Sequence, residues 1–235
     1  MKILALETSA VTASVAVTED ETLLAQSFQN SGLTPSATLM PMVADLLKNP
    51  GLKLEDMDEI AVAAGPGSFT GIRIGVAAAK GLAWPQDKLC APCSTLESMA
   101  WQCAHMEGEI CAVMDARRKQ VYNARFLAHN GSLTRLTEDR AIGVEELLEE
   151  LSGAEKPVTL VGDGARLCKA AFDTAGIAAV MAPPHLICQT AWGVARAALE
   201  LAKAGKLIPA GQMTPQYHRL SQAERERLER EEMNQ

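Results

Sequence analysis

The chain has 235 residues, so it holds one large or two small domains, given that a typical domain has about 150 residues. Hydrophobic residues make up 48% of the chain, which excludes a disordered protein and supplies material for a core. Aromatic residues make up only 4% and the net charge is −7, and both values disfavour a protein that binds nucleic acid on its own.

No apolar run approaches the length of about 18 residues that a transmembrane helix needs. An apolar stretch follows Lys2, but Glu7 interrupts it too early for a signal peptide. We therefore expect a cytoplasmic protein with no membrane contact, whose six cysteines are reduced.

The first half of the chain predicts strands followed by helices. Residues 3–6, 14–17 and 22–28 are rich in strand formers and predict three antiparallel strands in succession. Residues 36–48 predict a helix that Pro41 kinks unless it lies near the first turn. Its apolar positions are Leu39, Met40, Met42, Val43, Leu46 and Leu47. The next predicted elements are a buried strand at 60–64, a helix at 70–84 and a short strand at 89–92. After them we expect a helix that Ser94 caps and that ends near residue 102.

The pattern restarts after residue 108. Residues 110–114 and 121–127 predict strands around a turn, 144–151 a short helix, 158–161 a strand, and 190–204 a long amphipathic helix. Asp163 is predicted to cap a helix that ends near residue 172. We expect two related α/β domains, 1–106 and 107–220, with helix 190–204 able to pack back on the first domain.

Residues 221–235 form a charged tail. Ser221 and Glu224 have the spacing of a capping box, and Glu226 and Arg230 are spaced to pair on a helix. The tail is either a solvated terminal helix or a docking segment that orders on a partner.

A glycine-rich segment, G-P-G-S-F-T-G-I-R-I-G at residues 65–75, joins the buried strand to the second helix. It is neither a Walker A loop nor the dinucleotide fingerprint, because its spacing differs from both and no Lys-Ser/Thr pair follows. On a helical wheel Gly71, Gly75, Ala78 and Leu82 share one face. That face either admits a closely packed helix, or the loop holds a phosphate on its backbone N–H groups; glycine serves both.

Other residues give less specific indications of a functional site. Cys90 and Cys93 form a lone CxxC, and with Cys103, His105 and Glu109 they suggest either a zinc site, a redox pair or buried structural thiols. Glu7 ends the first strand, where it is either a catalytic acid or a partner for backbone amides of the turn.

Six segments in order across the chain resemble the TsaB family, formerly YeaZ: residues 3–9, 39–43, 65–75, 115–118 with 121–122, 161–165 and 215–219. The residues of this chain that match the family's motifs, here called the motif residues, are Glu7, Thr8, Ser9, Gly65, Gly67, Ser68, Phe69, Thr70, Asp115, Arg117, Tyr122, Gly162, Asp163, Gly164, Tyr217 and Arg219.

The resemblance implies the α/β fold of the actin, sugar-kinase and Hsp70 (ASKHA) superfamily, with a helix-flanked mixed sheet in each of two domains. It also implies a role in making threonylcarbamoyladenosine (t6A) next to the anticodon of tRNA, as a non-catalytic subunit that binds the transferase TsaD and the ATPase TsaE. No cofactor is expected on this chain, because ATP and metal belong to the partner subunits. The chain is expected to contact tRNA only as part of the complex. Without TsaD, the family forms homodimers.

In the family, the first helix and the glycine-segment helix meet TsaD. The interface residues predicted on that basis are Leu39, Met40, Val43, Leu47, Gly71, Arg73, Gly75, Ala78 and Leu82. A Gly75→Leu substitution is then expected to weaken the complex.

The chain departs from the family pattern and from TsaD in three places. Residues 34–37 are Thr-Pro-Ser-Ala where many relatives have Thr-His-Ser-Glu. Val11 and Thr12 stand where TsaD carries an acidic pair, and His105 with Glu109 only partly matches its His-x-x-x-His metal motif. Two rival hypotheses remain: an ATP-dependent phosphotransferase using the glycine turns at 65–71 and 162–164, and a metallopeptidase using His105, Glu109 and the cysteines.

Overall fold

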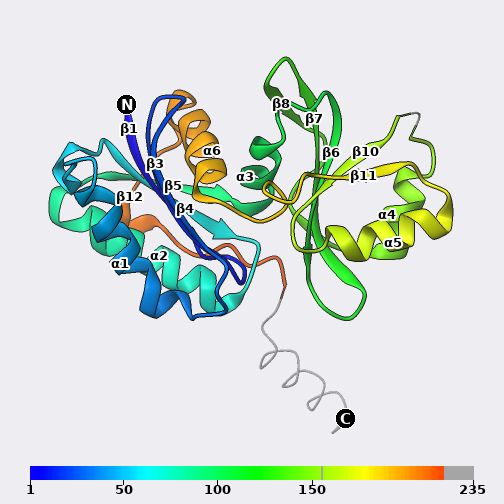
Figure 1. Cartoon of the computed structure of the whole chain (residues 1–235), viewed down its shortest axis with the longest axis horizontal. Helices are drawn as coiled ribbons and strands as arrows, with labels where there is room; N and C mark the ends of the chain where they lie inside the picture. The colour runs from blue at the N-terminus through cyan, green and yellow to red at the C-terminus, as the bar shows by residue number, and fades with distance from the viewer. Residues whose placement is uncertain (155, 220–235) are drawn as a thin grey trace, which may run out of the picture.

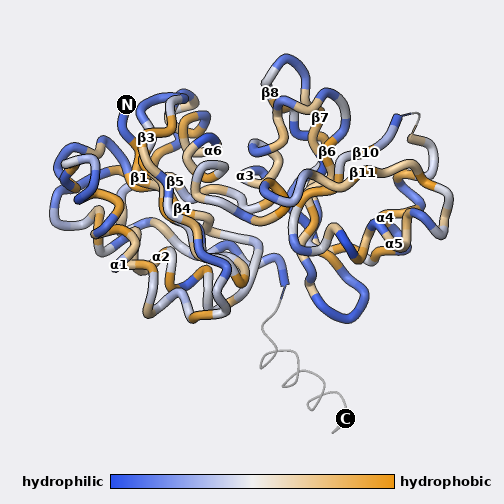
Figure 2. Tube along the Cα trace, in the orientation of Figure 1, coloured by the Kyte–Doolittle hydropathy of each residue, from blue (hydrophilic) through white to orange (hydrophobic). Residues whose placement is uncertain are grey.

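The computed structural model describes residues 1–154 and 156–219, which form two lobes, each built on a six-stranded sheet (Figure 1). Hydrophobic residues follow the central strands of both sheets, and hydrophilic residues gather in the outer loops (Figure 2). Among the described residues no helix is both long enough and apolar enough to cross a membrane.

The first sheet has the strand order β12-β5-β4-β1-β2-β3. Its strands are β1 (Lys2–Glu7), β2 (Ala13–Glu19), β3 (Thr22–Gln29), β4 (Glu59–Gly65), β5 (Leu89–Ser94) and β12 (Ile208–Pro209). β1, β2 and β3 pair antiparallel in succession, as the sequence predicts, and β4 and β5 add in parallel.

Helices cover both faces of this sheet because its strands are apolar on both sides. Leu4 and Leu6 of β1 face α1 (Pro35–Lys48) and α2 (Phe69–Ala83), whereas Ile3 and Ala5 face α6 (Ala191–Lys203). Short 3-10 turns lie at Leu54–Asp56, Trp84–Gln86 and Ala210–Gln212.

The second sheet has the order β11-β10-β6-β7-β8, and β9 also pairs with β7. Its strands are β6 (Gly108–Asp115), β7 (Gln120–His129), β8 (Ser132–Arg135), β9 (Arg140–Gly143), β10 (Val158–Val161) and β11 (Ala179–Met181). Ile110 and Ala112 pack toward α3 (Thr95–Gln102), while Cys111 and Val113 pack toward α4 (Val144–Leu151) and α5 (Ala165–Ala175).

The chain returns to the first lobe after β11. α6 packs on β1, β2, β4 and β5 and against α3, and β12 pairs antiparallel with β5. The helix expected at 190–204 therefore contributes to the core of the first sheet, although it follows the second sheet in the chain.

α1 continues through Pro41, which lies beyond its first turn, so the kink expected there stays a prediction; the carbonyl that loses its hydrogen bond belongs to exposed Ala37. The predicted cap of α5 is wrong. Gly164, and not Asp163, is the N-cap residue of α5, while the Asp163 carboxylate accepts a hydrogen bond from Gln189 Nε2 at 3.3 Å. The predicted tail at 221–235 lies outside the described residues.

Candidate functional site

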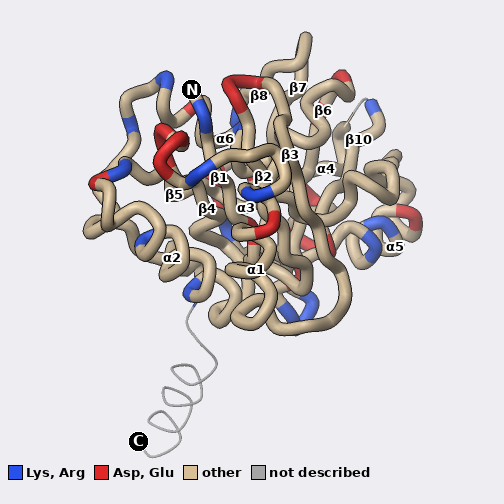
Figure 3. Tube along the Cα trace, turned by 60° about the vertical axis from the view of Figure 1, so that its left-hand side comes forward, with Lys and Arg blue, Asp and Glu red and all other residues tan. Residues whose placement is uncertain are grey.

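Two features gather the residues that the sequence singled out: the paired helices α1 and α2, and a cleft between the lobes. α2 begins at a capped end, since Ser68 Oγ accepts the N–H of Gly71 at 3.3 Å. α1 and α2 contact each other, and their charged residues are few: Asp45, Lys48, Arg73 and Lys80 (Figure 3).

The glycines of α2 serve packing within this chain. A Cβ on Gly71 would lie 2.0 Å from the carbonyl oxygen of Thr8, and one on Gly75 would lie 2.5 Å from Thr8 Oγ1. The Thr8 hydroxyl in turn donates to the Gly71 carbonyl at 2.8 Å. The close approach inferred from the sequence is therefore made to the end of β1, and Gly75→Leu would disturb this chain's own fold.

The predicted interface residues divide by burial, and the prediction is wrong for those that lie in the core. Leu39, Val43, Gly71 and Gly75 are buried. Leu47, Ala78 and Leu82 are half-buried against the same core, and only Met40 and Arg73 are exposed. The sequence pattern marked the apolar side of each helix, which is the side that its own sheet covers.

The exposed side of the two helices carries small or apolar residues beside the charged Asp45, Lys48 and Arg73. The uncharged group is here called the α1/α2 face and consists of Ala37, Met40, Pro41 and Ala44 of α1 with Ala77 and Gly81 of α2. Nothing lies within 4 Å of where a Cβ on Gly81 would stand, so this surface is open.

The inter-domain cleft is a polar cavity of about 430 Å³. Its walls include most of the motif residues: Ser9, Gly67, Ser68, Phe69, Asp115, Arg117, Tyr122, Asp163 and Arg219. Val11, which departs from the TsaD pattern, completes it together with Ala10, Met114 and Ala116, which are not motif residues. Segments far apart in the chain thus meet because the ends of β1, β4, β6 and β10 face one another across the lobes.

Glu7 lies just behind the cleft, at the end of β1. Its carboxyl is fully buried, and Oε1 accepts the N–H of Ser9 at 2.5 Å, while Oε2 has no partner among the described residues. Burial and, to a smaller extent, the charge of Asp163 raise the pKa of Glu7 to about 7, against the lowering effect of the hydrogen bonds with Ser9. Of the two roles left open by the sequence, this contact matches the backbone partner in a turn.

A strap formed by residues 213–219 joins the cleft to α2. Tyr217 stacks on Phe69 with ring centroids 4.7 Å apart, and Arg73 Nε donates to Tyr217 Oη at 2.7 Å. The N–H of Gln216 bonds the carbonyl of Ala64 at 2.8 Å, and the Arg219 guanidinium donates to the carbonyl of Ala116. Because Ala64 and Ala116 belong to different lobes, the strap connects the two.

The candidate metal and redox residues lie apart. Cys90 and Cys93 belong to β5 and pack in the hydrophobic cores on opposite faces of the sheet. Side chains alternate between the two faces along a strand, so residues three positions apart point to opposite sides. Burial raises the pKa of Cys90 to about 11, which disfavours a reactive thiolate. Glu109 is held by Arg125 Nε at 2.5 Å, and the described residues contain no group of three potential metal ligands.

Known proteins of one family are similar to this chain over most of its length. The family model described as "TsaD: tRNA N6-adenosine threonylcarbamoyltransferase" matches residues 34–230. The chain is 34% identical over 232 residues to the tRNA threonylcarbamoyladenosine biosynthesis protein TsaB of Bacillus subtilis, covering 97% of this chain and 99% of that protein.

The chain belongs to the TsaB family of tRNA threonylcarbamoyladenosine biosynthesis proteins. The Escherichia coli TsaB is 35% identical over 159 residues, covering 65% of this chain and 68% of that protein. The solved structure of YeaZ from Pseudomonas aeruginosa superposes with a TM-score of 0.79 at 25% identity, over 92% of this chain and 99% of that one.

More distant structures share the fold alone. The activator of 2-hydroxyisocaproyl-CoA dehydratase from Clostridium difficile superposes with a TM-score of 0.51 at 13% identity, covering 88% of this chain and 97% of that one. The superposition and the two mixed sheets flanked by helices together confirm the predicted ASKHA fold.

Proposed function

We propose that this chain is a non-catalytic subunit of the t6A machinery, which binds TsaD through the α1/α2 face and acts together with TsaE. The observation that carries the proposal is an open, weakly charged surface on the two helices through which the family is expected to meet TsaD. In the absence of TsaD, the same surface would pair two copies of the chain.

The α1/α2 face has the composition that close helix packing needs. Ala37, Ala44, Ala77 and Gly81 are small, so a partner helix can approach their backbones without displacing long side chains. Met40 is 45% exposed and supplies a flexible apolar side chain at the centre of α1. Interfaces deplete charge at their cores, and the residues of this face are uncharged, although exposed Asp45, Lys48 and Arg73 lie one helical turn from it.

The inter-domain cleft supports a non-catalytic role. Val11 is 68% exposed and lines the cleft, where the resemblance places part of the acidic pair of TsaD. Thr12 is buried and its hydroxyl donates to the carbonyl of Gln189 at 3.4 Å. Neither side chain offers a carboxylate to a metal ion.

A second candidate function is an ATP-dependent phosphotransferase. It is favoured by the cleft itself, which brings Gly67 and Asp163 of the two glycine-bearing turns to one polar cavity together with Arg117. ATP binding by the isolated chain, measured by calorimetry, distinguishes the two functions: the subunit hypothesis expects none, and stoichiometric binding favours the phosphotransferase.

The first test is a reconstitution of tRNA modification with TsaD, TsaE, the synthase of the threonylcarbamoyl adenylate, ATP, threonine and bicarbonate. We expect t6A to form only when this chain is added. Equal modification without the chain would refute the proposed subunit role.

The second test locates the partner surface. Ala44→Glu and Ala77→Glu place a carboxylate on the α1/α2 face, and we expect each to weaken TsaD binding at least tenfold because the charge would have to leave water when a partner packs there. Ala170→Glu, at an exposed position of α5 in the other lobe, is the matched control and should bind normally. Normal binding by both α1/α2 variants would exclude this face.

A further inference from the structure

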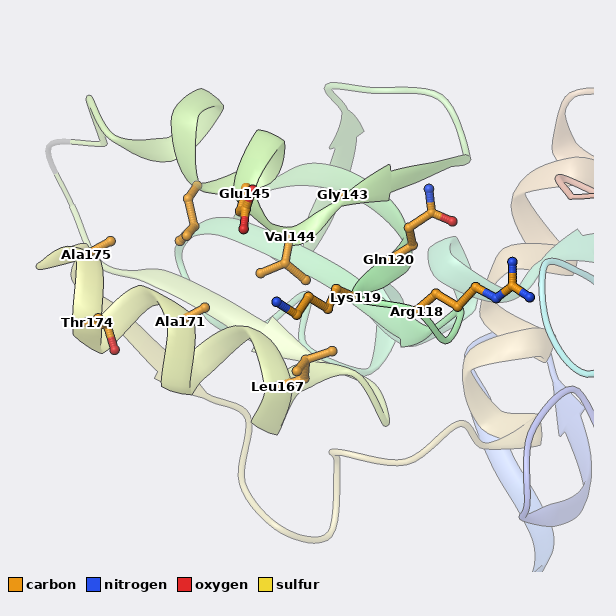
Figure 4. Close-up of a pocket in the computed structure, with 11 residues that line it drawn as sticks. Arg118, Lys119, Gln120, Gly143, Val144, Glu145, Leu167, Ala171, Thr174 and Ala175 are labelled. Carbon is orange, nitrogen blue, oxygen red and sulfur yellow. The ribbon is translucent and has the colours of Figure 1, made fainter.

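A cavity of about 580 Å³ lies between α4 and α5 in the second lobe (Figure 4). It is separate from the inter-domain cleft and from the α1/α2 face, and none of its lining residues is a motif residue. Its volume falls within the range of about 300–1,000 Å³ that small-molecule sites occupy.

The cavity exists because the side chains with which α4 and α5 pack on the sheet are not the ones that line the cavity. Leu147 and Leu151 of α4 and Cys168 and Phe172 of α5 are buried against β6 and β10. The neighbouring side of each helix is therefore left without a covering layer.

Apolar side chains form most of the cavity wall. They are Val144 and Leu148 from α4 and Leu167 and Ala171 from α5. Leu167 remains 42% exposed, and Ala171 is too short to fill the space opposite Val144. The wall is thus apolar surface that a ligand would remove from water.

The positively charged side chain of Lys119 lies at this wall. In Figure 4 the Lys119 side chain extends between Val144 and Leu167, whereas Arg118 points away. Within the described part of the chain, no carboxylate oxygen lies within 4.0 Å of the Lys119 ammonium. A positive charge over an apolar surface is complementary to an acid with an apolar body.

The turn that places Lys119 is unusual. Arg117, Arg118 and Lys119 have φ values of 67°, 54° and 58°, three successive left-handed residues that are not glycine, which costs conformational free energy. The carbonyl of Lys119 accepts the N–H of Val144 at 3.1 Å, which ties this turn to the first residue of α4. The backbone from which the Lys119 side chain extends is therefore tied to the wall of the cavity.

We propose that this cavity binds a small amphipathic acid, with its apolar body between α4 and α5 and its carboxylate at Lys119. Lys119 is the cation that extends into the cavity, and Glu145 also lines it. A single carboxylate pairs with the Lys119 charge and adds less negative charge beside Glu145 than a phosphate dianion would.

Decanoate is the probe, titrated onto the whole chain by calorimetry, with decyltrimethylammonium as a ligand of similar body and opposite charge. We expect decanoate to bind at least tenfold more tightly than the cation. In spectra of methyl-labelled protein, decanoate should shift the signals of Leu148, Leu167 and Ala171. No binding of decanoate, or equal binding of both probes, would overturn the proposal.

Two variants with matched controls assign the contacts. Lys119→Met should weaken decanoate binding about fivefold, as the loss of one partly exposed ion pair predicts, and Lys206→Met should not. Leu167→Glu should weaken it more, because its charge repels the carboxylate, while Leu136→Glu, at a similar exposure of 46%, should leave it unchanged.

A second copy of the chain is the other possible occupant of the cavity. Methyl signals that shift with protein concentration and not with decanoate would assign the cavity to that contact and refute the proposal. Because these measurements use this chain alone, their failure leaves the proposed binding of TsaD untouched.

Discussion

Glu7 should make the stability of this protein depend on pH. Its carboxyl is fully buried, and burial raises its pKa from 4.5 to about 7. Since the folded state holds the proton more tightly than the unfolded chain does, folding is favoured when Glu7 is protonated. The free energy of unfolding should therefore fall as the pH rises from about 4.5 to about 7 and level off above that.

The size of this effect follows from the two pKa values. Linkage between a pKa of 4.5 in the unfolded chain and about 7 in the folded protein gives a loss of roughly 2–3 kcal/mol between pH 5 and pH 8. Glu7→Gln removes the titration while keeping an oxygen that can accept the N–H of Ser9. The variant should lose roughly 2–3 kcal/mol less than the native chain over this pH interval.

Urea unfolding followed by circular dichroism at pH 5 and pH 8 measures the difference. Comparing the two pH values separates the titration from any constant cost of burying the glutamine amide. Glu138→Gln, at an exposed position, is the control and should change the pH difference by less than about 0.5 kcal/mol. If Glu7→Gln lost as much stability as the native chain, the argument from burial would be refuted.

Three substitutions test the contacts around α2 by thermal unfolding. Gly71→Ala should destabilise the protein by about 3 kcal/mol, because its Cβ would lie 2.0 Å from the Thr8 carbonyl oxygen, whereas Gly81→Ala should be neutral or stabilise it by up to about 1 kcal/mol. Equal effects at both positions would contradict the packing argument. Tyr217→Phe should cost about 1 kcal/mol by removing the hydroxyl that Arg73 Nε contacts, and unchanged stability would mean that the ring stacking alone holds the strap.

Local patterns in the sequence were sufficient for most elements. The runs of strand formers predicted the three antiparallel strands of the first sheet, and apolar residues at helical spacing predicted α1. Short strands such as β9 and β12 were missed, because Arg140–Gly143 and Ile208–Pro209 carry too few residues to show a period. Asp163 was assigned to a cap because its type favours that position, but its side chain bonds Gln189 instead.

The sequence by itself marked the motif residues, most of which line the cleft. Their meeting there was decided by the tertiary structure, which brings the ends of β1, β4, β6 and β10 together across the lobes. Only the tertiary structure decided which face of α2 is free. Gly71 and Gly75 mark a close approach, but a helical wheel cannot tell whether the approaching backbone belongs to a partner or to the chain's own β1. The tertiary structure likewise decided the role of Cys90 and Cys93, because both lie in β5, whose geometry places the two thiols on opposite faces of one sheet.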